Sequence, residues 1–282
     1  MTDKMKNLAV RTLSGIVLAA VVLGAVAWSP WSFGALLLLL LVGGMHEFYA
    51  LAEARGDRPQ RLIGMVTGAV LFAVNFAFLS GSAGAAGGLR PLLAAGMAFL
   101  LLLLPLMLVC ELYRRGENPA ANVGVTLLGI CYVALPLTLI AYIPFVGRYA
   151  WNPWTMLFFV FIIWANDVFA YLVGMAFGRH RLFERLSPKK SWEGFFGGVA
   201  GALVMGYVAS RCMGEAWWVW IGLALVAAVT GVLGDLVESM FKRAAGVKDS
   251  GTIIPGHGGI LDRFDAMLLA APFVVVYLWF VL

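Results

Sequence analysis

The chain has 282 residues, of which 62% are hydrophobic and only 12% are charged, and its formal net charge at pH 7 is +5. Soluble domains carry about 25% charged residues, so this composition excludes a soluble globular protein. Together with a mean hydropathy of +0.91, it indicates an integral membrane protein.

Apolar stretches that approach or exceed the roughly 20 residues needed to cross a bilayer recur throughout the chain. We therefore predict an all-α fold, a polytopic membrane protein with about nine transmembrane helices. In chain order the predicted spans are about 8–28, 31–53, 61–80, 90–112, 121–145, 153–178, 194–211, 216–241 and 265–282. Only Trp28-Ser29-Pro30-Trp31 separates the first two spans, which predicts a tight turn there.

The first span has an alternative interpretation as a cleaved signal peptide. Lys4, Lys6 and Arg11 precede an apolar run that ends near Ala25-Val26-Ala27, and this run resembles a cleavage site. The second span follows at once, which favours a first helix that is retained.

The three cysteines, Cys110, Cys131 and Cys212, all fall in apolar spans and form no C-x-x-C pair. We expect buried small side chains, with no disulfide framework and no zinc site.

The basic residues predict the orientation of the chain. When the polar segments are assigned alternately to the two sides of the membrane, one side holds only Arg90, Arg148 and Arg211, and the other holds the remaining 17 of the 20 Lys and Arg residues. Basic loops are retained in the cytoplasm. We therefore predict a cytoplasmic N-terminus and active site, a C-terminus outside, and cytoplasmic loops at 179–193 and 242–264.

Polar residues are concentrated in the second half of the chain. We therefore predict an N-terminal transmembrane scaffold over residues 1–150, which holds the first five spans, and a catalytic transmembrane region over residues 151–282.

Asp167 lies well inside the sixth span. A carboxylate at that depth costs about 2.5–3.5 kcal/mol on insertion scales, so it is a functional candidate. Tyr171 follows four residues later and shares its helix face. A hydrogen bond between helices is the alternative role.

A short basic loop, Ser187-Pro188-Lys189-Lys190-Ser191-Trp192-Glu193-Gly194, leads into the seventh span. Ser191 can cap that helix, whose N-terminus favours anions. The alternative is a plain basic loop that only sets the orientation.

One face of the eighth span carries Asp235, Glu238, Ser239 and Lys242, which are spaced i, i+3, i+4 and i+7. This face lies at the predicted cytoplasmic end of the span. Two acids before a Lys-Arg pair favour a metal or phosphate site, and a salt-bridged helix end at the interface is the alternative.

The most distinctive segment runs from 239 to 265, where glycines alternate with ionisable residues. Its glycines allow backbone N–H groups to approach an anion, as in phosphate-binding nests. Asp262 and Asp265 follow at i and i+3, and carboxylates beside phosphates suit Mg²⁺. An ordinary charged connection is the alternative. His46-Glu47 in the second span does not form H-E-x-x-H, because residue 50 is Ala, and we expect Glu47 to be a buried polar contact or a support for the site.

The segment from Ser239 to Asp265 resembles the signature of the phosphatidate cytidylyltransferase (CDP-diacylglycerol synthase) family, S-x-hydrophobic-K-R-x4-K-D-x-small-x2-hydrophobic-P-x-H-G-G-hydrophobic-x-D-R-hydrophobic-D, and matches every specified position. Ser187–Gly194 is similar to the family's S-P-K-K-[ST]-x-E-G. Asp167 with Ala170-Tyr171 is similar to its D-x-x-A-Y, although Val168 and Phe169 stand where the family has small residues.

This resemblance implies transfer of CMP from CTP to phosphatidic acid, which yields CDP-diacylglycerol and pyrophosphate and requires Mg²⁺. A second cation is left open. The implied partners are CTP, phosphatidic acid, membrane lipid and a second copy of the chain, with no nucleic acid. The implied location is the bacterial cytoplasmic (inner) membrane.

The resemblance also implies roles for individual residues. The expected catalytic residues are Asp235, Lys248, Asp249, His257, Asp262 and Arg263. The expected substrate-binding residues are Asp167, Ser187, Lys189, Lys190, Glu193, Ser239, Lys242 and Arg243. The expected metal ligands are Asp235 and Asp262, with Asp265 and Asp249 as second choices.

Two other functions compete with this one. The first is a related CTP-using enzyme with another lipid acceptor, such as a polyprenol kinase or an archaeal-lipid cytidylyltransferase. The second is a transporter or channel with Glu47, Asp167 and Asp235 along a pathway. The concentration of polar residues at a single membrane face disfavours transport.

Overall fold

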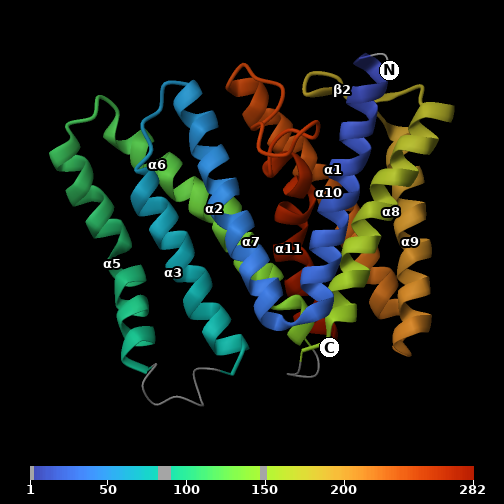
Figure 1. Ribbon diagram of the computed structural model, residues 1–282, viewed down its shortest axis with the longest axis horizontal. Helices are drawn as coiled ribbons and strands as arrows, with labels where there is room; N and C mark the ends of the chain where they lie inside the picture. Colours follow the sequence, from blue (N-terminus) through green and yellow to red (C-terminus); the bar gives the residue numbers. More distant parts are fainter. Residues whose placement is uncertain (1–2, 82–89, 147–150) are drawn as a thin grey trace. The chain divides into compact units, whose positions relative to one another are not determined.

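The computed structural model describes the backbone of residues 3–81, 90–146 and 151–282, and the side chains of residues 11–81, 94–146 and 151–282. Over these residues the protein is almost entirely helical (Figure 1). Nine helical segments of the described chain are long and apolar enough to cross a membrane: Arg11–Trp28, Pro30–Ala54, Arg61–Leu79, Ala94–Arg114, Pro119–Phe145, Pro153–Phe177, Trp192–Met213, Trp217–Ala244 and Leu261–Val281. This confirms the predicted all-α, polytopic membrane fold.

The regular elements follow one another in this order: α1 (Asp3–Trp28), α2 (Pro30–Ala54), α3 (Arg61–Leu79), α5 (Arg90–Arg114), α6 (Pro119–Gly129), α7 (Leu135–Ile140), α8 (Pro153–Phe177), β1 (Arg181–Phe183), β2 (Ser187–Ser191), α9 (Trp192–Met213), α10 (Trp217–Ala244) and α11 (Leu261–Val281). A π-helical turn, Ile130–Ala134, joins α6 to α7, so that together they form one span. Pro136 follows this turn and has no N–H to donate to residue 132, which favours the wider turn.

The described chain forms two compact units that do not follow a single cut in the sequence. The first unit contains residues 1–142 and 244–263, and the second contains residues 143–243 and 264–282. The first boundary between the units, after residue 142, lies close to the predicted division at residue 150. The segment 244–263, which we assigned to the catalytic half, packs within the first unit.

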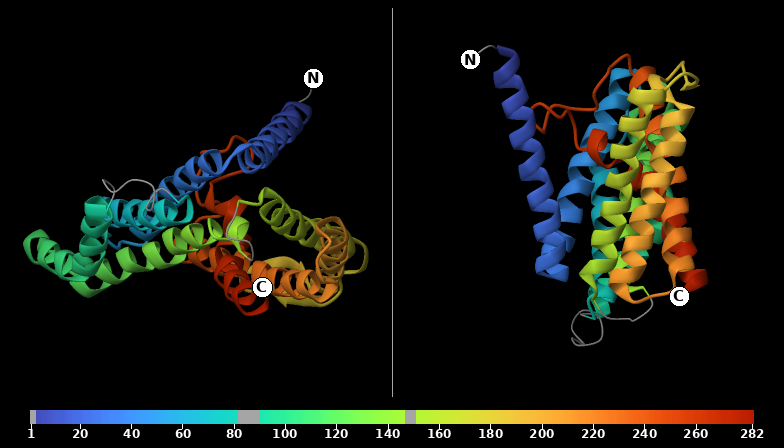
Figure 2. Two further views of the ribbon diagram at one scale, coloured as in Figure 1. Left: turned by 90° about the horizontal axis from the view of Figure 1, so that it is seen from below. Right: turned by 90° about the vertical axis from the view of Figure 1, so that its right-hand side faces the viewer.

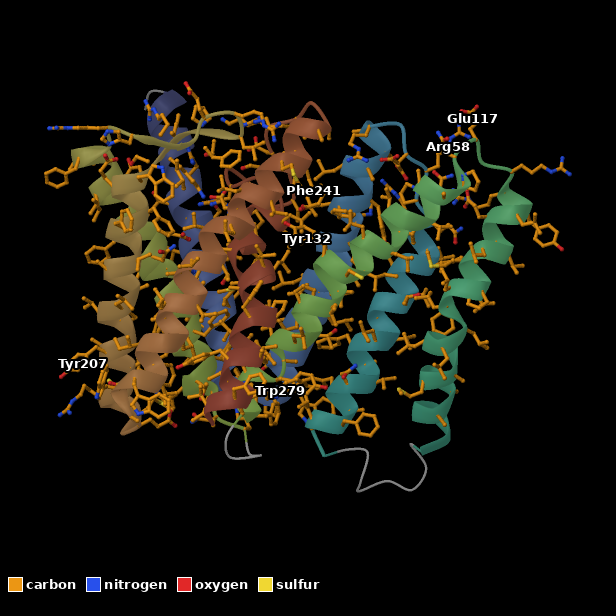
Figure 3. All side chains as sticks on the ribbon, turned by 180° about the vertical axis from the view of Figure 1, so that it is seen from behind. Arg58, Glu117, Tyr132, Tyr207, Phe241 and Trp279 are labelled. Carbon is orange, nitrogen blue, oxygen red and sulfur yellow. The ribbon has the colours of Figure 1, made fainter. Side chains whose placement is uncertain are left out.

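In the first unit, α2, α3 and α5 lie side by side, and the α6–α7 helix packs against α2 and α3 (Figure 1). Only Ser29 separates α1 from α2, which confirms the tight turn, and its hydroxyl accepts a hydrogen bond from the backbone N–H of Ser32. Tyr49 is fully buried in this core, and its hydroxyl donates to the carbonyl of Thr126 (2.9 Å). Arg58 and Glu117 lie at the same end of this unit (Figure 3).

In the second unit, α8 and α9 pack along most of their lengths. Close approach is possible because Gly194, Gly197, Gly198 and Gly201 of α9 face α8, where a Cβ on any of them would lie within 3.0 Å of an α8 atom. Tyr207 and Trp279 lie toward the end of the unit that is away from β2 (Figure 3), and both are exposed, as is typical of aromatic residues at a membrane interface.

The segment 179–193, which we predicted to be a basic loop, contains regular secondary structure. It contains a short antiparallel hairpin in which Arg181 pairs with Ser191 and Phe183 with Ser187. Strands of three and five residues are too short to give a recognisable alternation in the sequence.

The cysteines are free, as expected, but the prediction that they are buried is wrong for two of them. Cys131 and Cys212 are exposed on their helices and Cys110 is half-buried. An apolar span presents one side to its neighbours and the other to lipid, and hydropathy alone does not distinguish the two sides.

Candidate active site

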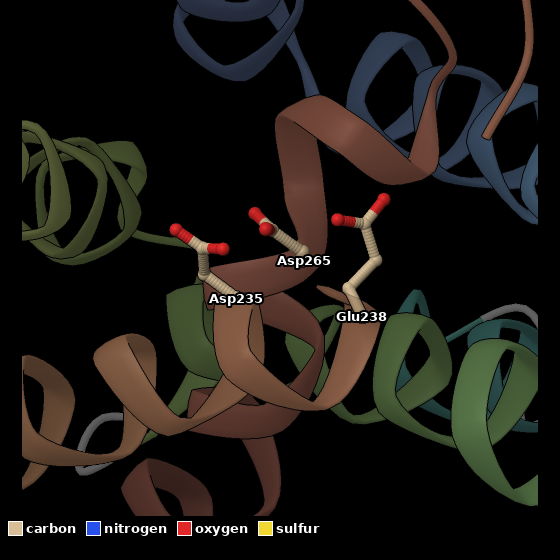
Figure 4. A group of neighbouring side chains, drawn as sticks. All are labelled: Asp235, Glu238 and Asp265. Atoms are coloured by element: carbon tan, nitrogen blue, oxygen red, sulfur yellow. The ribbon is translucent and has the colours of Figure 1, made fainter. Parts of the chain in front are cut away.

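The second unit contains a group of three carboxylates. Asp235 and Glu238 project from α10 and Asp265 projects from α11, and the three side chains point to the same side (Figure 4). One oxygen from each residue lies within 4.8 Å of the others. Gly234 permits this arrangement, because a Cβ there would lie 2.5 Å from the carbonyl oxygen of Asp265. The two helices therefore bring their acids together at a point where their backbones nearly touch.

The carboxylate group carries more negative than positive charge. Lys190 forms an ion pair with Asp235 (2.6 Å), and Lys242 pairs with Glu238 on the same helix. Glu238 is buried, and Asp265 lies within electrostatic range of Asp167 as well as of the other two acids. Three clustered carboxylates with two lysine partners leave an excess of negative charge that a divalent cation would neutralise. Carboxylate oxygens are also the ligands that Mg²⁺ prefers, so this donor set fits the metal.

A cavity of about 450 Å³ in the second unit connects this group to the hairpin. Asp235 lies at its wall together with Asp167 and Tyr171 of α8 and with Ser187, Lys189 and Lys190 of β2. Apolar residues complete the lining, namely Met175, Leu182, Phe195 and Val232. The cavity thus presents lysines, carboxylates and an apolar wall within one space, which suits a ligand that has both phosphates and an apolar part.

The hairpin is held in place at the N-terminus of α9. Ser191 is the N-cap of this helix, as predicted, and its hydroxyl accepts from the N–H of Gly194 (3.1 Å). Glu193 accepts from Nδ1 of His180 (2.6 Å) and from the backbone N–H of Arg179 (3.0 Å). Glu193, which we predicted to bind substrate, is therefore engaged with the start of the hairpin that carries the two lysines.

In the first unit, the segment 244–263 is folded around protein carboxylates. Oδ2 of Asp262 accepts from the N–H groups of Ser250 (2.9 Å) and Gly259 (2.8 Å) and from the Ser250 hydroxyl (3.0 Å). Glu47 accepts from the N–H groups of Ile260 and Leu261 (both 2.9 Å). The backbone amides do meet anions, as the glycine pattern predicts, but these anions are side chains of the protein.

The remaining polar side chains of this segment are more exposed. Lys248, Asp249 and Arg263 are exposed, and Nε of Arg263 donates to the carbonyl of His257 (3.0 Å). The ring of His257 forms a hydrogen bond with the hydroxyl of Ser14 in α1 (2.8 Å), and Figure 2 shows the segment reaching that helix.

The structure thus divides the predicted site residues between the units. Asp235, Asp265, Ser239 and Lys242 lie in or beside the carboxylate group, where the Ser239 hydroxyl is 3.3 Å from Asp235. Asp167, Ser187, Lys189 and Lys190 line the cavity. Asp262, our first choice as a metal ligand with Asp235, is engaged with Ser250 and Gly259. Arg243 is exposed at the end of α10.

Glu238 has a larger role in this geometry than we predicted. It is the third member of the carboxylate group, and its i, i+3 spacing from Asp235 was the signal in the sequence. Glu47, which we expected to be a buried polar contact or a support for the site, is buried and accepts from the backbone of the signature segment, which confirms a buried polar contact.

Comparison with known proteins agrees with this site. Residues 9–281 match the model of the Cytidylyltransferase family, so the chain belongs to that family. It is 32% identical over 295 aligned residues to a "Phosphatidate cytidylyltransferase" of Synechocystis sp., covering 95% of each chain. It is 33% identical over 283 aligned residues to a protein of that name from Brucella abortus, covering 97% of this chain and 94% of the relative. A protein of the same name from Haemophilus influenzae is 43% identical over 160 residues, covering 50% of this chain and 55% of the relative. These findings confirm the resemblance identified from the signature.

Proposed function

We propose that this protein transfers CMP from CTP to phosphatidic acid, yielding CDP-diacylglycerol and pyrophosphate, and so serves phospholipid synthesis. The observation that carries the proposal is the carboxylate group beside a cavity that also presents Lys189, Lys190 and an apolar wall. Relatives that align over nearly the whole chain bear the name of this activity.

The carboxylates of Asp235, Glu238 and Asp265 would hold a magnesium ion. When bound, Mg²⁺ offsets the charge of the triphosphate and makes its phosphorus a better electrophile. Asp262 stays a predicted ligand from the signature, but its three hydrogen bonds within the loop support a different role, which is to hold that loop.

The reaction needs no nucleophile from the protein. A phosphate oxygen of phosphatidic acid forms a bond to the α-phosphorus of CTP, the bond from that phosphorus to the bridging oxygen breaks, and pyrophosphate leaves with the electron pair. The protein contributes position and positive charge. We assign Lys189 and Lys190 to the phosphates in the cavity. Arg243, Lys248 and Arg263 stay predicted phosphate-binding residues from the signature. Lys190 and Lys242 both pair with carboxylates of the group, but only Lys190 also lines the cavity, so we assign no phosphate to Lys242.

The proposal includes a location and an assembly. We place the chain in the bacterial cytoplasmic membrane with the N-terminus and the active site in the cytoplasm, on the strength of the distribution of basic residues. The homodimer rests on the family resemblance alone. Cys212 lies one residue before the end of α9, so its labelling by a charged thiol reagent added to either side of sealed vesicles tests the location. Light scattering in detergent tests the dimer.

In the decisive experiment, the detergent-purified protein is incubated with phosphatidic acid, MgCl₂ and CTP that is radiolabelled at either the α- or the γ-phosphate. Label from the α-phosphate is expected in lipid, and label from the γ-phosphate is expected in pyrophosphate. A lipid kinase would instead place the γ-label in lipid. Absence of α-label from lipid, with a cooperative thermal transition that shows an intact fold, would contradict the proposal. Asp235→Asn is the inactive control, and Glu111→Gln, which alters a buried glutamate of the first unit, is the active one.

A further inference from the structure

Glu47 is a buried carboxylate in the C-terminal half of a transmembrane helix, seven residues before the helix ends. Its side chain lies in α2 and the residue is 3% exposed. A charged group at such a depth is costly unless it is fully hydrogen-bonded. Both of its oxygens are engaged, and every partner that the structure gives them belongs to the segment 250–261.

The partners of Glu47 lie at two places within the signature segment, residue 250 and residues 260 and 261. Oε1 accepts from the N–H of Ile260 (2.9 Å), and Oε2 accepts from the N–H of Leu261 (2.9 Å) and from the hydroxyl of Ser250 (3.0 Å). The same Ser250 hydroxyl lies 3.0 Å from Oδ2 of Asp262. The carboxylate therefore ties residue 250 to residues 260 and 261, which closes the loop at its base.

Glu47 also acts as a cap for α11 from a different helix. Ile260 and Leu261 lie at the start of α11, where the first N–H groups have no acceptor within the helix and carry the positive end of its dipole. A carboxylate is the strongest side-chain acceptor for such groups. Because Asp262 and Asp265 follow in the next residues of α11, the cap also fixes the start of the helix that carries them.

The loop backbone packs so closely against the Glu47 carboxylate that a side chain at Gly251 or Gly259 would clash with it. A Cβ at Gly251 would lie 2.5 Å from Oε1 of Glu47, and a Cβ at Gly259 would lie 2.6 Å from the same atom. Two glycines of the signature are therefore explained by the close approach of their backbone to this side chain, rather than by an approach to phosphate.

We propose that Glu47 is a positioning residue for CMP transfer. It fixes the loop from residue 250 to residue 260, which carries His257 and directly follows Lys248 and Asp249, and it fixes the first turn of α11. This inference rests on the proposed function and adds a requirement to it: the loop must be held by a charge, and a neutral side chain of the same shape is not sufficient. Glutamine cannot satisfy the site, because its NH₂ group would face the N–H of Leu261 or of Ile260.

The test compares Glu47→Gln with two further variants and one control. Glu47→Asp keeps the charge but shortens the reach, and Ser250→Ala removes one partner outside the transmembrane helix. Glu111→Gln is the matched control: Glu111 is also 3% exposed, lies in the same unit and accepts from Gln60, Asn122 and Arg114, so its loss tests stability without touching the loop.

We expect Glu47→Gln to lower kcat by about tenfold to a hundredfold, the effect of losing one charge-assisted hydrogen bond at a positioned site. The KM for CTP is expected to change by less than about threefold, because Glu47 positions the loop for the chemical step and does not itself bind CTP. Glu47→Asp should recover part of the rate. Glu111→Gln should lower the melting temperature and leave kcat unchanged. Hydrogen exchange of the 250–261 peptide should accelerate in Glu47→Gln and Ser250→Ala but not in Glu111→Gln.

Three outcomes would overturn the inference. A kcat for Glu47→Gln within twofold of wild type would show that the charge is not needed. Equal losses of kcat in Glu47→Gln and Glu111→Gln would show that both act through stability alone. Unchanged exchange of the 250–261 peptide would show that Glu47 does not hold the loop. If wild type itself forms no CDP-lipid, the proposed function is wrong. The hydrogen-exchange result then still shows whether Glu47 holds the loop.

Discussion

Replacement of Asp265 by Asn should stabilise the metal-free protein and remove its response to magnesium. The oxygens of the carboxylate group lie within 4.8 Å of one another, and two like charges at that distance repel by about 3 to 4 kcal/mol at an effective dielectric constant near 20. Asp265 takes part in two such pairs, one with buried Glu238 and one with Asp235, which is partly exposed and better screened. Lys190 and Lys242 offset a large part of this repulsion.

Asn has the shape of Asp without the charge. After the attraction of the two lysines is discounted, we expect the variant to gain about 1 to 3 kcal/mol in the absence of metal. For a chain of this size that gain raises the melting temperature by about 3 to 10 °C. In wild type, a cation at a hundred times its dissociation constant adds about 2.7 kcal/mol of stability, which the variant should lose.

Thermal unfolding in detergent, followed through tryptophan fluorescence in EDTA and in increasing MgCl₂, measures both effects. Asp57→Asn is the control, because it removes a carboxylate of the first unit that pairs with Arg55. The reasoning is refuted if Asp265→Asn melts below wild type in EDTA and still gains as much stability from MgCl₂ as wild type does.

Other variants test separate contacts. Lys190→Met removes the 2.6 Å ion pair with Asp235. We expect the KM for CTP to rise about tenfold in steady-state assays, and we expect Lys190→Arg to have a KM close to that of wild type. An unchanged KM in Lys190→Met would argue against a lysine that faces a phosphate. Ser14→Ala removes the 2.8 Å hydrogen bond to His257, and we expect a fall in kcat of about threefold to tenfold, with full activity as the contrary result. Arg115 has φ of 51°; Arg115→Gly should relieve about 1 kcal/mol of strain and raise the melting temperature, and a lower value would contradict this.

The transmembrane helices were predictable because bilayer thickness dictates their length. Each of the nine predicted spans overlaps an observed one, and the largest disagreement at a boundary is a few residues, as at the start of α11, where Asp262 and Arg263 belong to the helix. Charged residues at the end of a span lower the local hydropathy, so hydropathy alone places the helix start too late.

The arrangement of the site was only partly predictable. The spacing of Asp235, Glu238, Ser239 and Lys242 places them on one face of α10, and the structure has them there. The choice of Asp262 over Glu238 as the second metal ligand beside Asp235 came from the signature, which fixes residue types and spacing but not the direction of each side chain. The contact between Glu47 and the loop joins residues more than two hundred positions apart, and a single sequence contains no signal for such a pair.

The partners of Glu47 also set an order of events during synthesis. Its hydrogen-bond donors lie 203, 213 and 214 residues further along the chain. At an elongation rate of roughly 5 to 20 residues per second, these donors are synthesised about 10 to 40 s after Glu47. Throughout that time an ionisable side chain lies in the second span without its final partners, which is energetically costly in a bilayer. The first unit therefore cannot finish folding until the ribosome has nearly reached the last helix, and a nascent chain stalled before residue 250 is expected to expose α2 to membrane quality control.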